Sequence, residues 1–316
     1  NPQLASAAMT ASSAGAVQKQ LDYTRDHERE ADRVGISILE NGGFDTNAMG
    51  SFFETMQKGT RYVEGSAPSF LRTHPITSER IADVRSRAST GRYRLLPYSP
   101  EFDYVRAKIL ANLGPANQAV SLFRGNLQDR RYSSETSQHY GLAIALLRNN
   151  DVAGAINEMN WLRANAPNHA FFANLAANIE VAKDNPAGAE KAYQSGLAIY
   201  PGSKALIYGY AEHFLRIRQP EKALKVLNEK QSLYPDDAKI FELKSKAYAN
   251  LGKRLLSHQA QGEAYVRRYN IPKAFEQMDL AVRANDGDFY QQSIVEARLK
   301  ELRAMIDEPK KNGWFN

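Results

Sequence analysis

Two short stretches of the chain carry residues that could take part in chemistry. The first is the charged stretch DYTRDHEREADRVG at residues 22–35, and the second is LRTHPITSERI, which contains His74, Pro75 and Arg80. Carboxylates and imidazoles bind metal ions or transfer protons, but they also form ordinary ion pairs. The elements that hold these side chains decide between the two interpretations.

The first stretch is predicted to be helical, and helical geometry divides its charges into two groups. A helix turns by about 100° per residue, so Leu21, Gly35 and Leu39 lie within about 20° of Glu28, and Asp32 lies about 40° away. Glu28 and Asp32 therefore share the apolar side that should face the protein. The charges expected to face solvent are Arg25, Asp26, Arg29 and Arg33.

An inward carboxylate needs a partner, because an unpaired buried charge is costly. For Glu28 and Asp32 the partner can be an arginine, a buried hydrogen-bond network or a metal ion. Geometry alone leaves these alternatives open, and a structural salt bridge is the most common of them. In the second stretch, Pro75 favours an extended backbone at His74, and the helix behind it presents Arg80. A lone histidine in a loop is more often structural or exposed than a ligand.

The C-terminal two thirds of the chain contain an internal repeat of 34 residues. Three sets of residues recur at this spacing: Pro167, Pro201 and Pro235; Ala143, Ala177 and Ala211; and Ala155, Ala189 and Ala223. Each unit is expected to hold two amphipathic helices, with the small residues at the helix crossing and the proline behind the second helix. This pattern resembles the tetratricopeptide repeat. The resemblance covers about five units, and the interaction surface should be the concave side formed mainly by the first helices.

The two stretches near the N-terminus together resemble the M48 family of zinc metallopeptidases, in which a Glu-x-x-Ala-Asp helix supplies a zinc ligand. The resemblance implies that Glu28 is a Zn²⁺ ligand and that Asp32 steadies it from behind. It also implies that His74, in a His-Pro motif, is a candidate fourth ligand that plugs the site. Arg80 matches the arginine that follows this motif and is a candidate helper near the site.

The expected architecture is all-α, with a truncated helical metalloprotease domain followed by a tetratricopeptide α-solenoid. Residues 1–91 should form the C-terminal part of the peptidase domain, and residues 92–99 the linker. Residues 100–271 should form the repeats, and residues 272–316 the capping helices and tail. The motif His-Glu-x-x-His does not occur in the 316 residues, so no catalytic residue is assigned. We therefore expect the chain to be a fragment without the upstream catalytic segment, inactive by itself.

The family resemblance also implies a function for the intact protein. A peptidase of this type joined to such repeats should be a periplasmic zinc endopeptidase and chaperone-like factor that acts on unfolded or misassembled outer-membrane β-barrel proteins. Its repeats should contact those clients and the outer-membrane assembly machinery. The alternative is a non-catalytic tetratricopeptide adaptor in envelope protein assembly, which the repeats fit equally well.

Composition excludes several other classes. The net charge is +6, from 41 basic and 35 acidic residues, and the two signs alternate along the chain. A nucleic-acid groove would need clustered lysine and arginine, so no nucleic-acid partner is expected. Cysteine is absent, which rules out disulfides and thiolate metal sites. No apolar run reaches the roughly 18 residues that a membrane-spanning helix needs.

Overall fold

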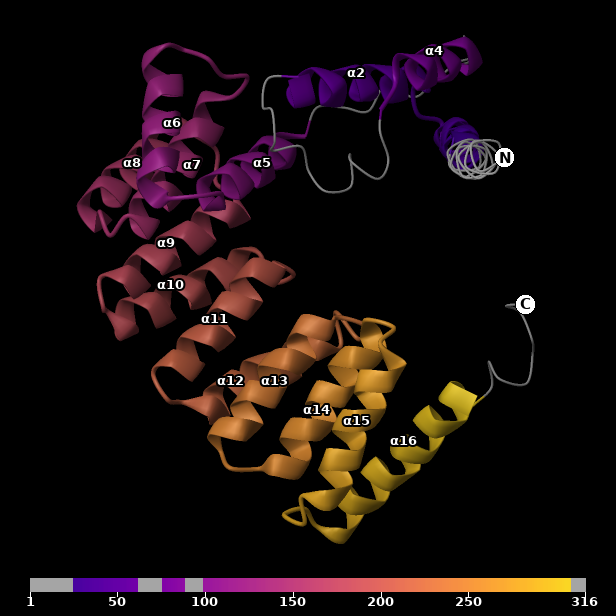
Figure 1. Ribbon diagram of the computed structural model, residues 1–316. Helices are drawn as coiled ribbons and strands as arrows, with labels where there is room; N and C mark the ends of the chain where they lie inside the picture. The colour runs from indigo at the N-terminus through magenta and orange to yellow at the C-terminus, as the bar shows by residue number, and fades with distance from the viewer. Residues whose placement is uncertain (1–24, 62–75, 89–98, 308–316) are drawn as a thin grey trace, which may run out of the picture. The chain divides into compact units, whose positions relative to one another are not determined.

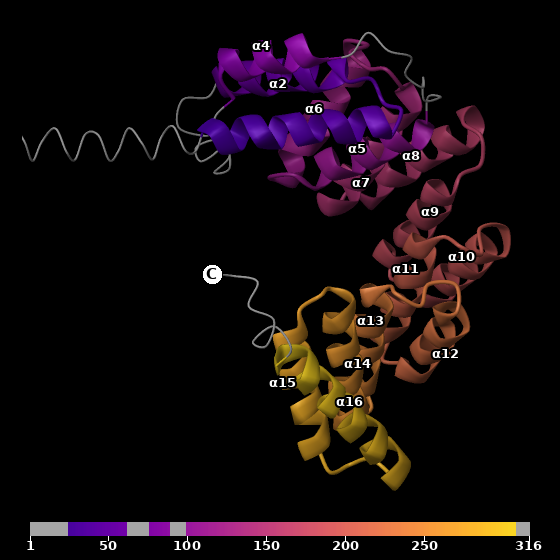
Figure 2. The ribbon, with the colours of Figure 1, turned by 90° about the vertical axis from the view of Figure 1, so that its right-hand side faces the viewer.

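The computed structural model describes residues 25–61, 76–88 and 99–307, and the chain divides into two compact units, residues 1–98 and 99–316. Every regular element in these described ranges is an α-helix, as the sequence predicts (Figures 1 and 2). None of the described helices is long and apolar enough to cross a bilayer. The proposed linker lies outside these ranges except for Ser99, and the domain boundaries stay predictions.

The first unit contains a helix over residues 25–41 and two further helices, α2 (Asn47–Arg61) and α4 (Ser78–Arg87). The first of these helices ends at Gly42-Gly43. The amide of Phe44 donates to the carbonyl of Leu39, and Gly43 has a φ of +70°. A glycine adopts this left-handed conformation without strain, which lets the chain leave the helix sharply.

A small apolar core joins these three helices. Its buried side chains are Ile36, Phe53, Ile81 and Val84, with Met49 packed against them. Phe52, the neighbour of Phe53 on α2, is 58% exposed and lies outside this core. Neighbouring residues on a helix point about 100° apart, and only one of the two can face so narrow a core.

The second unit consists of antiparallel helix pairs that follow one another along the chain (Figure 1). The helices are α5 (Pro100–Asn112), α6 (Ala116–Gln128), α7 (Glu135–Arg148), α8 (Val152–Asn165), α9 (Ala170–Ala182), α10 (Pro186–Ile199), α11 (Lys204–Arg216), α12 (Pro220–Gln231), α13 (Ala238–Asn250), α14 (Arg254–Arg267), α15 (Ile271–Arg283) and α16 (Phe289–Asp307). The predicted repeat therefore has its expected physical form, a solenoid of helix pairs.

Small residues lie where the two helices of a pair cross, as predicted. The repeated alanines are fully buried, and they are Ala143, Ala155, Ala177, Ala189, Ala211 and Ala223. In α13 and α14 serines take these places, and the two hydroxyls of Ser245 and Ser257 lie 3.2 Å apart. Small side chains let the two backbones approach, so each pair packs along its length.

The turns inside the pairs repeat with the same period. Residues Asn150, Asp184, Arg218 and Gly252 follow one another at 34-residue spacing, and each has a positive φ. The next residues begin the second helices, and Asp151 and Asn185 cap them by accepting hydrogen bonds from Gly154 and Gly188. A left-handed residue followed by a side-chain cap reverses the chain in a few residues.

Large apolar side chains fill the space between successive pairs. Examples are the buried side chains of Leu146, Met159, Tyr193, Phe214 and Leu227. At the C-terminal end, α15 packs against α14, and α16 packs against α15 (Figure 2). These last helices bury Met278, Val295 and Leu302 in a separate apolar cluster, which covers the end of the solenoid.

Candidate functional site

The two carboxylates predicted to face inward do so. The Glu28 side chain is 14% exposed and the Asp32 side chain is 4% exposed. Their neighbours Arg25, Asp26, Arg29 and Arg33 are exposed, as the helical phasing predicts. The helix over residues 25–41 therefore presents two carboxylates to the interior and the rest of its charge to solvent.

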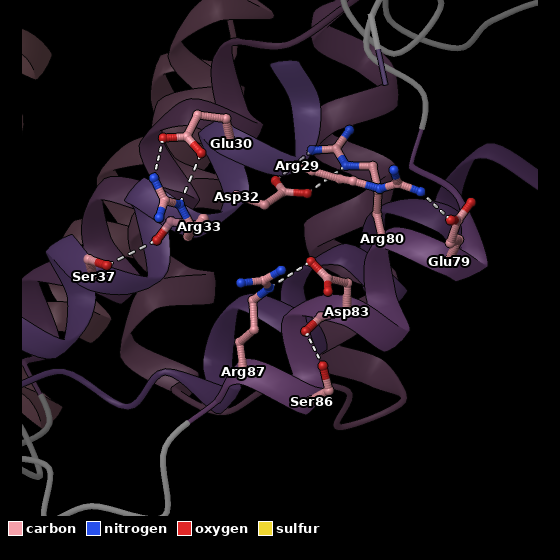
Figure 3. A network of polar contacts seen from close by, with 10 residues as sticks. All are labelled: Arg29, Glu30, Asp32, Arg33, Ser37, Glu79, Arg80, Asp83, Ser86 and Arg87. Atoms are coloured by element: carbon pink, nitrogen blue, oxygen red, sulfur yellow. Dashed lines mark hydrogen bonds and ion pairs between the residues drawn. The ribbon is translucent and has the colours of Figure 1, made fainter. Parts of the chain in front are cut away.

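Arg80 on α4 is the partner of both carboxylates. Its Nε and Nη2 atoms donate to the two oxygens of Asp32, each at 2.7 Å, and its Nη1 lies 2.8 Å from Oε2 of Glu28. Figure 3 shows Arg80 and Asp32 pointing toward each other from their two helices. A planar guanidinium that binds a carboxylate through two parallel hydrogen bonds is the strongest common form of ion pair.

The surroundings of Arg80 fix its position. The hydroxyl of Thr77 caps α4 by accepting a hydrogen bond from the Arg80 amide. The guanidinium carbon of Arg80 lies 5.2 Å from the centre of the Phe53 ring. The ring therefore makes a cation–π contact with the charged group from the side of the apolar core. Outside the buried cluster, Arg29 pairs with Glu79 and ties the same two helices together (Figure 3).

The electrostatics of the cluster follow from its composition. The hydrogen bonds to Asp32 raise the pKa of Arg80 above its ordinary value, and the charges of Asp32 and Glu28 act in the same direction. Arg80 is therefore permanently charged. With two carboxylates and one guanidinium, the three side chains carry a formal charge of −1, which favours a further cation beside them.

The cluster supplies part of a zinc site and not the whole of one. Catalytic zinc takes three protein ligands from histidine, cysteine, aspartate or glutamate. Glu28 is a half-buried carboxylate backed by a hydrogen-bonded Asp32 and Arg80, an arrangement that suits a single ligand. No group of three such ligands occurs among the described residues, and Glu28 itself contacts Arg80. These residues by themselves do not fit a bound zinc ion.

The structure describes Arg80 and Glu28 of the predicted site but not His74. His74, the candidate fourth ligand, lies outside the described residues, so its role stays a prediction. Arg80 was expected near the site as a helper, and it lies against both carboxylates. The salt bridge that helical geometry left open is present, and the metal role of Glu28 stays a prediction beside it.

Sequence reasoning did not foresee that one arginine would hold both carboxylates. A signal was available in α4, where Arg80 is one residue before Ile81 and one turn before Val84, both buried. That spacing places Arg80 at the edge of the inward face of α4. The support from Phe53 had no such signal, because it depends on how α2 and α4 pack.

Comparison with known proteins matches each unit to a family. Residues 3–88 match the sequence model of peptidase family M48, and residues 180–247 match that of the tetratricopeptide repeat. A segment that matches the M48 model is therefore followed in the chain by a segment that matches the tetratricopeptide repeat model. The M48-type match contains the helix over residues 25–41 and all of α4, and therefore the whole Glu28–Asp32–Arg80 cluster.

Relatives that align with nearly the whole chain carry the name β-barrel assembly-enhancing protease. The chain is 27% identical to the protein of Yersinia pestis over 313 residues and 28% identical to that of Escherichia coli K12 over 316 residues, in each case over 98% of the chain. A protein of Vibrio cholerae, called a putative β-barrel assembly-enhancing protease, is 29% identical over 305 residues. The chain spans 64% of the Yersinia protein and 63% of the Escherichia protein.

Solved structures similar to the chain include a tetratricopeptide repeat protein from Parabacteroides merdae. It has a TM-score of 0.40 and 15% identity, with 79% of this chain and 98% of that chain covered. MamA from Desulfovibrio magneticus has a TM-score of 0.38 and 18% identity, with 55% and 98% covered.

Proposed function

We propose that the protein is a zinc-dependent endopeptidase of the M48 type whose repeats bind clients and partners. The observation that carries this proposal is the Glu28–Asp32–Arg80 cluster inside the segment that matches family M48. A glutamate that only formed a surface ion pair would need neither burial nor a second carboxylate behind it. Here the bidentate Asp32–Arg80 pair fixes two helices, and the carboxylate of Glu28 is held at the edge of that pair.

In this proposal each residue of the cluster has its own part. Glu28 is one metal ligand, and the remaining ligands come from outside the described residues. Asp32 and Arg80 position Glu28, because together they lock the helix over residues 25–41 against α4. The zinc ion would supply a polarised, activated water for hydrolysis. His74 is proposed as a plug at the metal.

The remaining parts of the proposal concern partners and location. The names of the relatives connect them with β-barrel assembly, so we propose that the clients are unfolded or misassembled outer-membrane β-barrel proteins. The repeats would bind these clients and the assembly machinery in the periplasm, with a chaperone-like as well as a proteolytic effect. Partly exposed aromatic residues on first helices, such as Tyr208 and Tyr248, suit contacts with apolar client segments.

The experiment compares two glutamates on one helix in the full-length protein. Glu28→Gln removes the proposed ligand, while Glu30→Gln changes an exposed residue that pairs with Arg33 and serves as the matched control. Zinc content is measured by mass spectrometry, and proteolysis by cleavage of an unfolded β-barrel substrate. We expect Glu28→Gln to lower both zinc content and cleavage at least tenfold, and Glu30→Gln to change neither.

The same experiment separates the alternative function, a non-catalytic adaptor. An adaptor would bind unfolded β-barrel proteins without zinc and without cleavage, and Glu28→Gln would leave its binding unchanged. Equal zinc content and equal cleavage in the parent protein and Glu28→Gln would contradict the proposed role of Glu28. Absence of cleavage in the parent protein would favour the adaptor.

A further inference from the structure

The second unit contains an apolar groove between its third pair of helices and the helix before that pair. The groove has a volume of about 290 Å³ and is open to solvent along one side. Its walls come from α8 and α10 and its floor from α9, which lies between them in both views (Figures 1 and 2). α8 and α10 are the second helices of their pairs, so the groove differs from the concave surface that first helices form.

The groove exists because four side chains are small. They are Ala173 and Ala176 on α9, and Ala192 and Ser195 on α10. The residues at the same repeat positions 34 places earlier are His139, Leu142, Glu158 and Trp161, and those 34 places later are Ile207, Tyr210, Val226 and Glu229. All eight are larger, so the groove is peculiar to the third pair.

The larger residues fill the equivalent spaces in the neighbouring pairs. His139 stacks on Trp161 with 3.5 Å between the ring centres, and Leu142 is buried beside them. In the following pair Ile207 and Tyr210 are buried. Interiors of proteins are normally close-packed, so one open position in an otherwise filled series leaves apolar surface available for another molecule.

The chemistry of the groove selects the kind of molecule that fits. Its lining contains one full positive charge, Arg163, and no carboxylate. Arg163 is exposed, and its side chain contacts the side-chain oxygen of Asn160 at 3.4 Å. The carboxylate of Glu180 on α9 is hydrogen-bonded to Lys183, which lowers its pKa, and the charge of Arg163 adds a smaller effect in the same direction. His169 is already engaged, since its Nδ1 accepts from the Phe171 amide and its Nε2 contacts Glu101.

We propose that this groove docks a segment of a partner protein that carries a large apolar side chain next to a carboxylate. The apolar side chain would lie over Ala173, Ala176, Ala192 and Ser195, and the carboxylate would pair with Arg163. Ile199, which is 67% exposed at the rim, extends the apolar surface beyond the groove. An open groove of this size holds one or two side chains of a protein segment, whereas small-molecule sites enclose most of their ligand. The proposal rests on the proposed binding of partners by the repeats and deepens it, and its peptide-binding test is separate from the zinc and cleavage measurements.

The test uses the full chain and a fluorescein-labelled peptide of sequence Gly-Ser-Leu-Phe-Asp-Ser-Gly, with binding followed by anisotropy at up to millimolar protein. Two companion peptides replace Leu-Phe by Ala-Ala or Asp by Asn. We expect loss of the apolar side chains to raise Kd at least about tenfold, because their burial drives binding. Loss of the carboxylate at an exposed pair should raise Kd about two- to fivefold.

Three protein variants locate the binding. Ala176→Leu combined with Ser195→Trp copies Leu142 and Trp161 of the preceding pair and should raise Kd at least tenfold. Ala187→Leu adds bulk at an exposed position of α10 outside the groove and should leave Kd unchanged. Arg163→Gln should remove the difference between the Asp and Asn peptides, while the difference between Leu-Phe and Ala-Ala remains.

Each outcome decides the proposal. It is overturned if the filled variant binds the peptide as well as the parent chain, or if Arg163→Gln still distinguishes Asp from Asn. Circular dichroism establishes that the filled variant is folded, and if it is not, Arg163→Gln and the peptide series still decide. A concentration-dependent dimer that the filled variant abolishes would assign the groove to a second copy of the chain and overturn the partner-segment proposal.

Discussion

Replacing Arg80 by methionine should destabilise the first unit far more than removing any other ion pair of α4. The substitution keeps an unbranched apolar side chain in contact with Phe53 and removes the positive charge. Two carboxylates, Glu28 and Asp32, then remain close together, with 14% and 4% of their side chains exposed. The two hydrogen bonds to Asp32 are lost at the same time.

The size of the effect follows from burial. Removing one partner of a buried ion pair typically costs about 3–5 kcal/mol, because an uncompensated charge stays in the interior. Asp32 has less access to water than Glu28, whose side chain is 14% exposed. Because Glu28 keeps some contact with water, we expect a loss of about 3 kcal/mol, a large part of the roughly 5–15 kcal/mol that stabilises a folded unit.

The assay must report on the first unit alone, because the chain has two units. Hydrogen exchange measured by mass spectrometry does so through peptides from residues 25–41, 47–61 and 78–87. Arg85→Met is the matched control, since Arg85 lies on the same helix and pairs with Glu54 at 2.6 Å but is 55% exposed. An exposed pair contributes about 0.2–1 kcal/mol, so this control should change exchange only slightly.

Equal effects of the two substitutions would contradict this prediction. If Arg80→Met and Arg85→Met accelerate exchange in the first unit to the same extent, the Glu28–Asp32–Arg80 cluster does not hold the two helices together. Arg80→Lys gives a second comparison: a lysine keeps the charge but cannot bind Asp32 through two parallel hydrogen bonds, so an intermediate loss is expected.

Three further predictions concern other parts of the chain. His74→Ala should raise basal proteolysis of the full-length protein if His74 plugs the metal; cleavage of an unfolded substrate measures this, and an unchanged rate removes that role. Gly141→Ala should destabilise the second unit by about 1–3 kcal/mol, because a Cβ at residue 141 would overlap the buried Phe123 ring. Gly125→Ala, on α6, places its Cβ in open space and should stabilise the unit by about 0.5–1 kcal/mol. Urea unfolding monitored by circular dichroism compares the two variants, and equal shifts would contradict the packing. His213 is buried, and burial is the main reason that its pKa lies below the ordinary value. The unfolded chain therefore binds a proton at this histidine at higher pH than the folded chain. Stability present above pH about 6.5 should therefore fall as the pH is lowered from 7.5 to 5.5, and His213→Leu should reduce that fall; an identical fall in the variant would show that other groups cause it.

Much of the candidate site could be predicted because it depends on local periodicity. Helical phasing alone separated Glu28 and Asp32 from the exposed charges around them, since a helix fixes the direction of each side chain. The partner could not be identified in the same way. Arg80 lies 48 residues beyond Asp32 in the sequence, and its contact with both carboxylates depends on the packing of α4 against the first helix.

In the repeats, too, some features could be predicted from the sequence and others could not. The 34-residue period predicted the alanine crossings, because those positions have the same role in every pair. The groove of the third pair is a departure from the period, and alanines at Ala173 and Ala176 look like ordinary packing residues until their neighbours are placed. The burial of His213, in contrast, follows the period, because the residues at the same repeat position in the other pairs are buried and apolar: Ala145, Ile179 and Ala247.

The central claim, that Glu28 is a metal ligand held in place by Asp32 and Arg80, is tested most directly by locating zinc in a crystal of the full-length protein. Anomalous diffraction at the zinc edge identifies the ion and its ligands. The claim predicts zinc at about 2.0–2.2 Å from an oxygen of Glu28, with Arg80 still bound to both oxygens of Asp32. A zinc ion bound without Glu28, or a zinc-loaded protein in which Arg80 has left Asp32, would contradict it.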